Sequence, residues 1–276
     1  MKAIKVKQLA LLTAMFAALQ GASAQSLTPF HLSHRVFISW GYNRAQFTTS
    51  NIHFTGPGYD FILHDVVADD KPERFSFGNY FNPKNLWIPQ YNYRAGWFLS
   101  DHWSLSLGLD HMKYVVGNDQ DVRITGSISA QRSTQFAGDE DHLVKLTSDF
   151  LRYEHTDGLN LLSADADHYD QLLISANGRH AVFLTEGLFA GPVIPRTDVR
   201  LFGEGINNKF HLAGYGAGAQ LGLFAVLSDR LFLRAAAKAG YIELPSVLTT
   251  GSSEDRARQR FWFVQEYAVL GVLIGK

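Results

Sequence analysis

IPQYNYRAGWFLSDHWSLSLGLDHMKYVV, residues 88–116, alternates apolar and polar side chains in two runs on either side of a short polar break. Successive side chains leave a β-strand on opposite faces, so a period of two predicts one strand in each run. The break at Ser100, Asp101 and His102 predicts a tight turn that joins the two strands into a hairpin. The residues that share the apolar face are Tyr91, Tyr93, Ala95, Trp97, Leu99, Trp103, Leu105, Leu107 and Leu109.

The turn also predicts the pairing register of this hairpin. If Phe98 pairs with Ser104, then Asn92 lies opposite Asp110. One face of the hairpin is then apolar or aromatic, and the other is small, polar or charged. This division suits a sheet that covers a soluble core, and it equally suits a membrane barrel with lipid outside and a polar interior. The rest of the chain distinguishes the two.

The bulk composition narrows the class of protein. The chain has 276 residues, of which 46% are hydrophobic, which is enough for one substantial domain. Its formal net charge of −1 gives no basic excess, so nucleic acid is not an expected partner. The chain contains no cysteine, which excludes disulfides, thiolate metal sites and a cysteine nucleophile.

The N-terminus has the pattern of an export signal. Lys2, Lys5 and Lys7 precede an apolar run over residues 9–19, and an Ala-Ser-Ala cleavage site follows at residues 22–24. The run is shorter than the ~20 residues that a spanning helix needs. We therefore predict a signal peptide over residues 1–24 and a single outer-membrane β-barrel domain over residues 25–276.

The spacing of the strands decides between the soluble sheet and the membrane barrel. Three connections are short, around Ser100, Ala176 and Ser228, and four are long, at residues 48–86, 117–157, 192–209 and 245–259. Tight turns that alternate with long loops are the layout of outer-membrane barrels. The chain is thus expected to be all-β, a closed antiparallel up-and-down transmembrane β-barrel with short periplasmic turns and long extracellular loops, in the outer membrane of a Gram-negative bacterium. The eight expected strands cover residues 35–47, 88–99, 103–116, 158–169, 179–191, 210–227, 231–241 and 260–274.

This layout resembles the small eight-stranded outer-membrane barrels of the OmpA, OmpX and OmpW group. Four segments also resemble those of an uncharacterised family of outer-membrane β-barrel proteins. They are GYDF at residues 58–61, DHMKY at 110–114, EHTDGLN at 154–160 and HLAGYG at 211–216. The resemblance implies the barrel fold over the mature chain and implies no known reaction.

Several polar residues fall on the face that would line the barrel. We expect an interior network formed by Asn92, Arg94, Asp110, Glu186, Gln220, Arg234, Lys238 and Glu266. A charge in a narrow lumen is costly unless it is paired, which favours a structural network of ion pairs and hydrogen bonds. The alternative is a polar path for a solute or a proton.

A second group of titratable residues is expected at the outer rim, including Glu154, Asp165, Asp167, His168 and Asp170. The candidates for catalysis in this group are Asp110, His111, His155 and Asp157, because histidine beside a carboxylate supplies a general base near neutral pH. Such residues could instead bind a divalent cation, for which carboxylates favour calcium. A solvated acidic surface that bridges lipopolysaccharide through divalent ions is the third interpretation. No metal site or cofactor is predicted on this basis.

These observations lead to three hypotheses for function. The first is a structural or surface-interaction role through the outer loops 48–86 and 117–157. The second is a lipid-A or phospholipid-modifying enzyme that uses the rim histidines and carboxylates. The third is a narrow channel or a carrier of small hydrophobic ligands. The expected partners are outer-membrane lipid, lipopolysaccharide and an unidentified surface ligand, with no nucleic acid.

Overall fold

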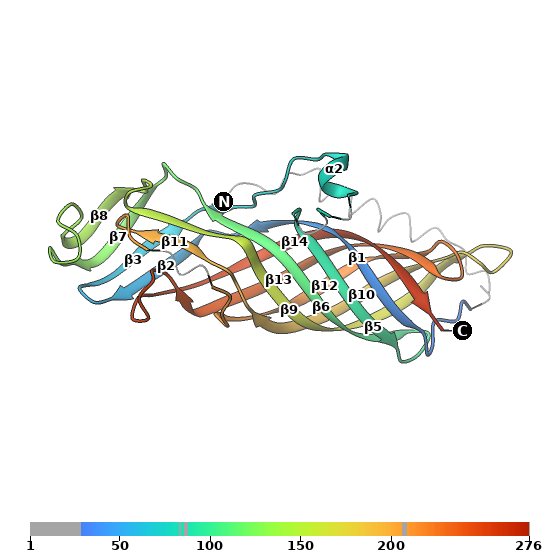
Figure 1. The fold of residues 1–276 in the computed structure, drawn as a ribbon. Coiled ribbons are helices and arrows are strands. Elements are labelled where there is room, and N and C mark those ends of the chain that lie inside the picture. The colour runs from blue at the N-terminus through green and yellow to red at the C-terminus, as the bar shows by residue number, and fades with distance from the viewer. Residues whose placement is uncertain (1–28, 83, 86–87, 206–208, 276) are drawn as a thin grey trace.

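A computed structural model describes residues 29–82, 84–85, 88–205 and 209–275 of the chain (Figure 1), so the predicted signal peptide lies outside the described residues. All the long strands expected from the sequence are present. They pair in the cyclic order β1, β5, β6, β9, β10, β12, β13, β14 and back to β1. Their bounds are β1 Val36–Phe47, β5 Tyr91–Phe98, β6 Trp103–Val116, β9 Leu151–Ile174, β10 Ala181–Val193, β12 Gly214–Val226, β13 Leu231–Leu248 and β14 Arg256–Ile274.

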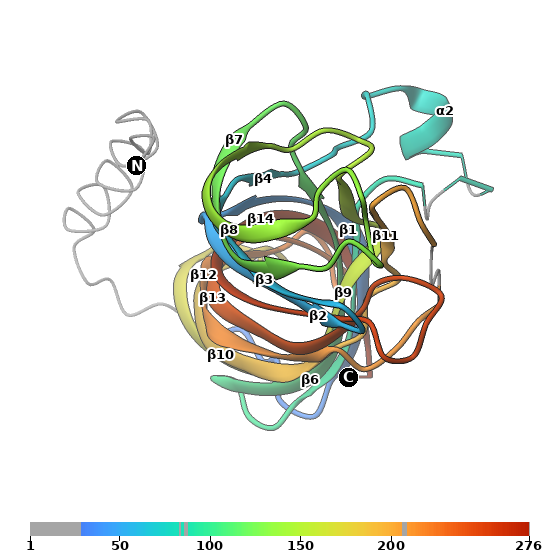
Figure 2. The ribbon, with the colours of Figure 1, turned by 90° about the vertical axis from the view of Figure 1, so that its left-hand side faces the viewer.

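The pairing of the first and last strands closes the ring. β1 runs antiparallel to β14 from Val36 opposite Ile274 to Phe47 opposite Phe263, so neither strand leaves an open edge over this length. The view along the barrel shows the closed wall (Figure 2). All neighbouring strands of the ring are antiparallel. The prediction of a closed antiparallel barrel is confirmed.

The predicted hairpin register is also confirmed. Asn92 lies opposite Asp110 across β5 and β6. On the other side of the barrel, Gln220 of β12 lies opposite Lys238 of β13, as the short turn between these strands predicts. Register matters here because a slip by one residue would move every polar side chain from the lumen to the outer wall.

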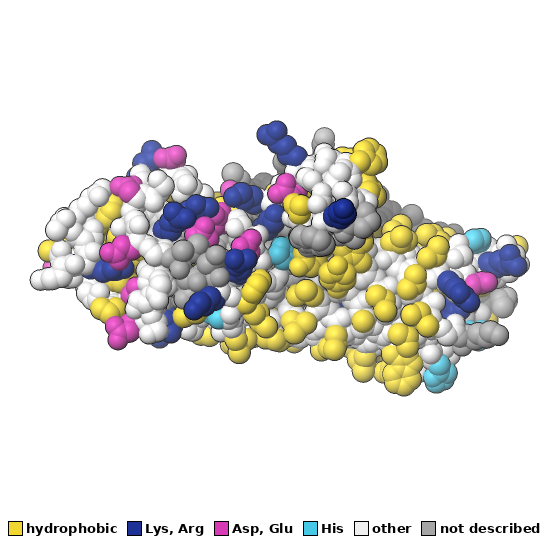
Figure 3. All heavy atoms as spheres, viewed as in Figure 1, with side chains coloured by type: hydrophobic (Ala, Val, Ile, Leu, Met, Phe, Trp, Pro, Cys, Tyr) yellow, Lys and Arg dark blue, Asp and Glu magenta, His cyan; other side chains and the backbone are white. Residues whose placement is uncertain are grey.

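The outer wall of the ring is apolar. Leucines such as Leu107 and Leu188 are 66% and 68% exposed on it, and hydrophobic side chains gather in a broad band over the strands while charged side chains gather at the ends (Figure 3). A closed sheet satisfies its backbone hydrogen bonds internally, so it can hold such a wall against lipid. The chain is therefore a transmembrane barrel of the kind found in the outer membrane of Gram-negative bacteria. Among the described residues, no helix has the length and apolar character needed to cross a bilayer.

Two of the long connections at one end of the barrel contain paired strands where the sequence predicted loops. Residues 48–86 supply β2 and β3, and residues 117–157 supply β7 and β8. These four strands continue the sheet from β14 in the order β2, β3, β7, β8, and we call them the β-extension (Figures 1 and 2). The inward residues of β2, β3 and β7 are mostly apolar and continue the hydrophobic core of the barrel into the β-extension, whereas β8 adds only the partly buried Val144. The remaining short elements are β4, which pairs with β6, β11, which pairs with β9, and the one-turn helix α2. The bounds are β2 Ser50–Gly56, β3 Tyr59–Val66, β4 Ala68–Asp69, α2 Phe77–Tyr80, β7 Asp121–Ile128, β8 Gly138–Lys145 and β11 Asp198–Leu201.

Two aromatic clusters fill the barrel at its two ends. The cluster at the short-turn end is built around Phe37, Phe98, Phe224 and Phe232, all 3% exposed or less. The other cluster extends from the end of the lumen opposite the short turns into the β-extension. The polar interior lies between them.

Candidate functional site

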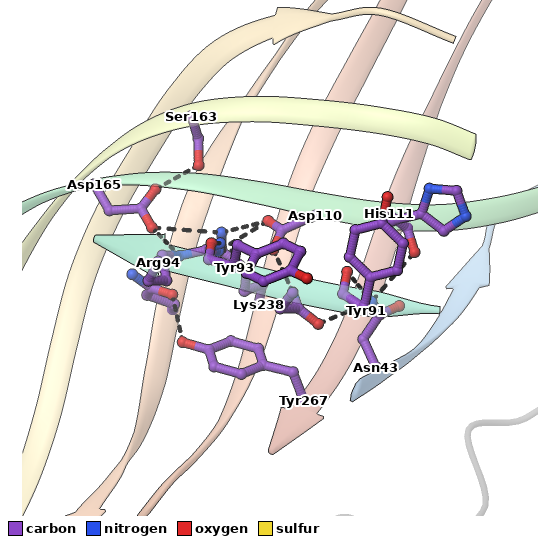
Figure 4. A network of polar contacts seen from close by, with 12 residues as sticks. Asn43, Tyr91, Tyr93, Arg94, Asp110, His111, Ser163, Asp165, Lys238 and Tyr267 are labelled. Carbon is purple, nitrogen blue, oxygen red and sulfur yellow. Dashed lines mark hydrogen bonds and ion pairs between the residues drawn. The ribbon is translucent and has the colours of Figure 1, made fainter. Parts of the chain in front are cut away.

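The middle of the lumen holds a network of ion pairs between strands on opposite sides of the barrel (Figure 4). Arg94 of β5 donates to both carboxylate oxygens of Asp110 of β6, at 2.7 and 3.0 Å. Its Nε lies 2.6 Å from Oδ2 of Asp165 of β9. Lys238 reaches across the lumen from β13 and donates to the second oxygen of Asp110 at 2.8 Å. The two cations thus share two carboxylates, and all four side chains are buried.

A second set of contacts adjoins the first towards the short-turn end. Arg234 of β13 donates from both terminal nitrogens to the carboxylate of Asp167 of β9, at 2.9 Å each. Gln220 donates to the same carboxylate at 2.8 Å and accepts from the hydroxyl of Tyr267 at 3.0 Å. The Tyr267 ring also lies between Arg234 and Arg94, whose guanidinium carbons are 5.9 and 5.8 Å from its centre. The aromatic ring therefore joins the two sets of contacts.

Small residues make room for these long side chains. Gly108 lies opposite Arg94, and a Cβ on Gly108 would come within 2.3 Å of the Arg94 guanidinium. Position 108 must therefore be a glycine if Arg94 is to lie in the network as it does.

The structure corrects several of the expected positions. Glu186 and Glu266 were expected inside but lie on the outer wall, where Glu186 has 55% of its side chain exposed. Asp165 and Asp167 were expected at the rim but lie in the lumen, because β9 runs through them with Ala164 and Ala166 outward. The expected residues that do lie in the lumen are Asn92, Arg94, Asp110, Gln220, Arg234 and Lys238.

Two further amides in the lumen were not anticipated. Asn43 of β1 donates to the Asn92 side chain at 2.8 Å, and Asn92 in turn donates to Asp110. Gln265 of β14 is fully buried next to Glu266, in the place expected for that glutamate. The signal that could have found Gln265 is the parity of β14, in which Phe263 and Tyr267 share its face.

The four catalytic candidates do not converge on one point. Asp110 belongs to the lumen network, while His111 points outward from the same strand and stacks on Tyr91 with ring centres 4.5 Å apart. The Nδ1 atom of His111 bonds the Asn160 side chain at 2.8 Å. Asp157 pairs with Arg196 at 3.2 Å. Alternation along β6 separates Asp110 from His111, so adjacency in sequence places them on opposite faces of the wall.

His155 lies on β9 next to the stretch that pairs with β11 and opposite Tyr114 of β6, beyond the exposed Leu162 of the apolar wall. It is fully buried, with Nδ1 at 2.8 Å from the hydroxyl of Thr197 and its ring against Tyr114 and Tyr153. Burial and, to a smaller extent, the nearby His211 together lower the pKa of His155 to about 3. A neutral, enclosed imidazole of this kind is a core residue rather than a solvent-accessible base.

We expect His155 to make the protein sensitive to acid. The unfolded chain binds a proton at this histidine below pH ~6.5, while the folded chain stays neutral there until pH approaches 3. The free energy of unfolding should therefore fall as pH drops through this window, by about 1.4 kcal/mol per pH unit from this site. Urea unfolding between pH 7.5 and 4 should show a flatter pH dependence for His155→Gln than for the wild type.

The matched control for this measurement is His142→Gln, since His142 has 56% of its side chain exposed on β8. Its pH dependence should run parallel to that of the wild type. If the His155→Gln and wild-type curves are parallel as well, buried His155 is not the source of the acid sensitivity.

Two serines that could act as a nucleophile beside these histidines, Ser163 and Ser133, do not complete a hydrolase site. Ser163 faces the lumen and donates to Asp165 at 2.6 Å, so its hydroxyl lies inside the ion-pair network. Ser133 lies between β7 and β8, where its backbone nitrogen donates to the carbonyl of Ser129 at 3.1 Å. Within the described part of the chain, neither serine forms a hydrogen bond with a histidine.

Comparison with known proteins found no matching family and no matching curated protein. Among solved structures, the outer membrane protein OprG from Pseudomonas aeruginosa is 10% identical, with 91% of this chain and 100% of that chain covered and a TM-score of 0.43. The outer membrane protein AlkL is 10% identical, with 93% and 96% covered and a TM-score of 0.37. Ail, the attachment invasion locus protein of Yersinia pestis, is 10% identical, with 86% and 99% covered and a TM-score of 0.30.

Proposed function

We propose that this barrel anchors a surface-interaction module in the outer membrane and that the β-extension is that module. The main support for this proposal is the structure of the long connections. They form a paired sheet with a buried aromatic core, instead of the open mouth that a channel needs or the converging side chains that a hydrolase needs. An ordered platform held away from the bilayer is suited to contact with another molecule.

The filled lumen supports the same function. Two aromatic clusters and the ion-pair network occupy successive levels of the barrel, and the charged groups of the network are paired with one another. Eight strands enclose a bore just wide enough for side chains. A barrel of this kind serves as an anchor, and its partners in the membrane are the surrounding lipid and lipopolysaccharide.

The last strand of the β-extension offers a place for the partner. β8 lies at the end of the sheet order with β7 as its recorded strand neighbour, so one side of its backbone is an unpaired edge within the described residues. Leu143 is 72% exposed on this strand. An edge strand binds an extended peptide segment by adding it to the sheet. We infer that the surface ligand is a protein segment that pairs with β8.

A photo-crosslinking residue in place of Leu143 tests this function on intact cells. We expect a discrete protein adduct at position 143, because the partner would lie along the β8 edge. The control carries the same residue in place of Leu107, which is 66% exposed on the lipid-facing wall and should give no protein adduct. The absence of a protein adduct at position 143, or discrete conductance steps from the wild-type barrel in a planar bilayer, would contradict the proposal.

A further inference from the structure

A cluster of imidazoles and carboxylates lies on the outer wall at the short-turn end of the barrel. We propose that His102, His168, Asp170 and Glu186 form a binding site for a divalent transition-metal ion, with zinc as the best match. One donor atom from each of His102, His168 and Asp170 lies within 4.8 Å of the other two. Glu186 joins them through a 3.5 Å approach of its Oε1 to Nδ1 of His168.

The four residues come from three elements that the barrel brings together. His102 closes the turn between β5 and β6, His168 and Asp170 lie on β9, and Glu186 lies opposite His168 on β10. The backbone of the turn is tied to β9, since the carbonyl of His102 accepts from the Tyr169 amide at 2.9 Å. The donor positions are therefore set by the sheet and not by a free loop.

The hydrogen bond of His102 fixes the ring nitrogen that is available to a metal. Its Nδ1 lies 3.0 Å from the carbonyl oxygen of Tyr169. A carbonyl oxygen only accepts, so Nδ1 carries the proton and Nε2 of the neutral ring keeps its lone pair. A histidine whose second nitrogen is held by a backbone carbonyl is the usual arrangement of a zinc ligand.

His168 supplies the second imidazole nitrogen that is available to a metal. Its Nδ1 is enclosed without a hydrogen-bond partner, and it lies 3.5 Å from an oxygen of Asp170 and 3.5 Å from an oxygen of Glu186. Both separations are long for hydrogen bonds. They are close to the edge of a zinc tetrahedron, which is about 3.3 Å for bonds of 2.0–2.1 Å. An ion at the centre would satisfy the nitrogen and both carboxylates together.

Charge and donor type identify the class of ion. Two carboxylates and two neutral imidazoles carry a formal charge of about −2, which one divalent cation balances. Imidazole donors suit zinc and its neighbours in the first transition row, whereas calcium and magnesium prefer oxygen donors alone. Bound there, the ion would fasten the β5–β6 turn to the β9–β10 hairpin.

The test is calorimetric titration of the folded, detergent-solubilised barrel with zinc, using protein without a histidine tag. We expect one zinc ion per chain and at least about tenfold weaker binding for His168→Gln. Asp170→Asn should weaken binding in the same direction, and this exposed change leaves the lumen and the core untouched. Zinc should also raise the unfolding temperature of the wild type, and a chelator should reverse the rise.

The matched control is His142→Gln, which removes the histidine of another histidine–carboxylate pair, 3.0 Å from Glu140 on β8. This variant should bind zinc as the wild type does. Saturable binding that survives both His168→Gln and Asp170→Asn would overturn the proposal, as would a wild-type barrel that takes up no zinc.

Discussion

Replacing Asp110 by alanine is expected to lower the free energy of unfolding by about 3–5 kcal/mol, because removal of one partner of a buried pair leaves an uncompensated charge. Asp110 is fully buried and pairs with both Arg94 and Lys238. Arg94 keeps its contact with Asp165 at 2.6 Å, but Lys238 is left 3.9 Å from the same carboxylate. The ammonium group therefore loses its only close partner among the described carboxylates. Urea unfolding with heat-modifiable gel mobility as the probe of the folded barrel measures the loss.

Two further variants separate the unpaired charge from a general effect of losing an aspartate. Asp60→Ala removes a carboxylate that is 70% exposed and should change the free energy of unfolding by less than about 0.5 kcal/mol. Adding Lys238→Met to Asp110→Ala should restore part of the lost stability, since the orphaned ammonium is then gone. If the double variant is less stable than Asp110→Ala alone, the unpaired lysine is not the cause.

The second large effect is expected in the β-extension. Phe61 of β3 is fully buried, stacks on Phe54 with ring centres 5.2 Å apart and lies 6.0 Å from Phe150. Phe61→Ala should cost about 3–5 kcal/mol through lost burial and the cavity left behind. Because this core lies beyond the membrane, the loss should appear as local opening of the β-extension while the barrel stays closed. Limited proteolysis of folded protein in detergent measures it, with new cuts expected between residues 48 and 70.

Phe77→Ala is the matched control for this experiment, since Phe77 is a phenylalanine that is 75% exposed in α2. It should leave the cleavage pattern of β2 and β3 unchanged. Cleavage of Phe61→Ala at the wild-type rate would show that the β-extension does not depend on its aromatic core. Loss of heat-modifiable mobility would show instead that the barrel and the β-extension unfold together.

The hairpin of residues 88–116 could be predicted in register because its alternation is strict and its turn is short. The side chains of Asn92, Arg94 and Asp110 were placed in the lumen on this basis. Glu186 and Glu266 were misplaced because their strands carry large apolar residues on both faces. Phe183 and Phe189 of β10 face the lumen while Leu188 faces outward. Hydrophobicity alone therefore could not show which face of β10 turns inward.

The positions of two aspartates of β9 were predicted wrongly for a different reason. Asp165 and Asp167 looked like a solvated rim, since two carboxylates in a lumen are unfavourable until their cations are known. Those cations are Arg94, about seventy residues earlier in the chain, and Arg234 and Lys238, about seventy residues later. The strands β2, β7 and β8 were missed because glycine and charged residues interrupt their apolar alternation. Their pairing depends on the aromatic core that they share across β2, β3 and β7, which no single segment displays.

The distribution of charge in the lumen bears on how the barrel assembles. The inner faces of β5, β6 and β9 carry Arg94 against three aspartates, and the inner face of β13 carries two cations with no acid. Before closure, the earlier half of the wall is therefore negative on its inner side and the later half is positive. Attraction between them favours curling of the sheet towards the side that becomes the lumen. In the closed barrel these opposite charges are paired across the lumen, so the network holds the inner faces of the two halves of the wall together.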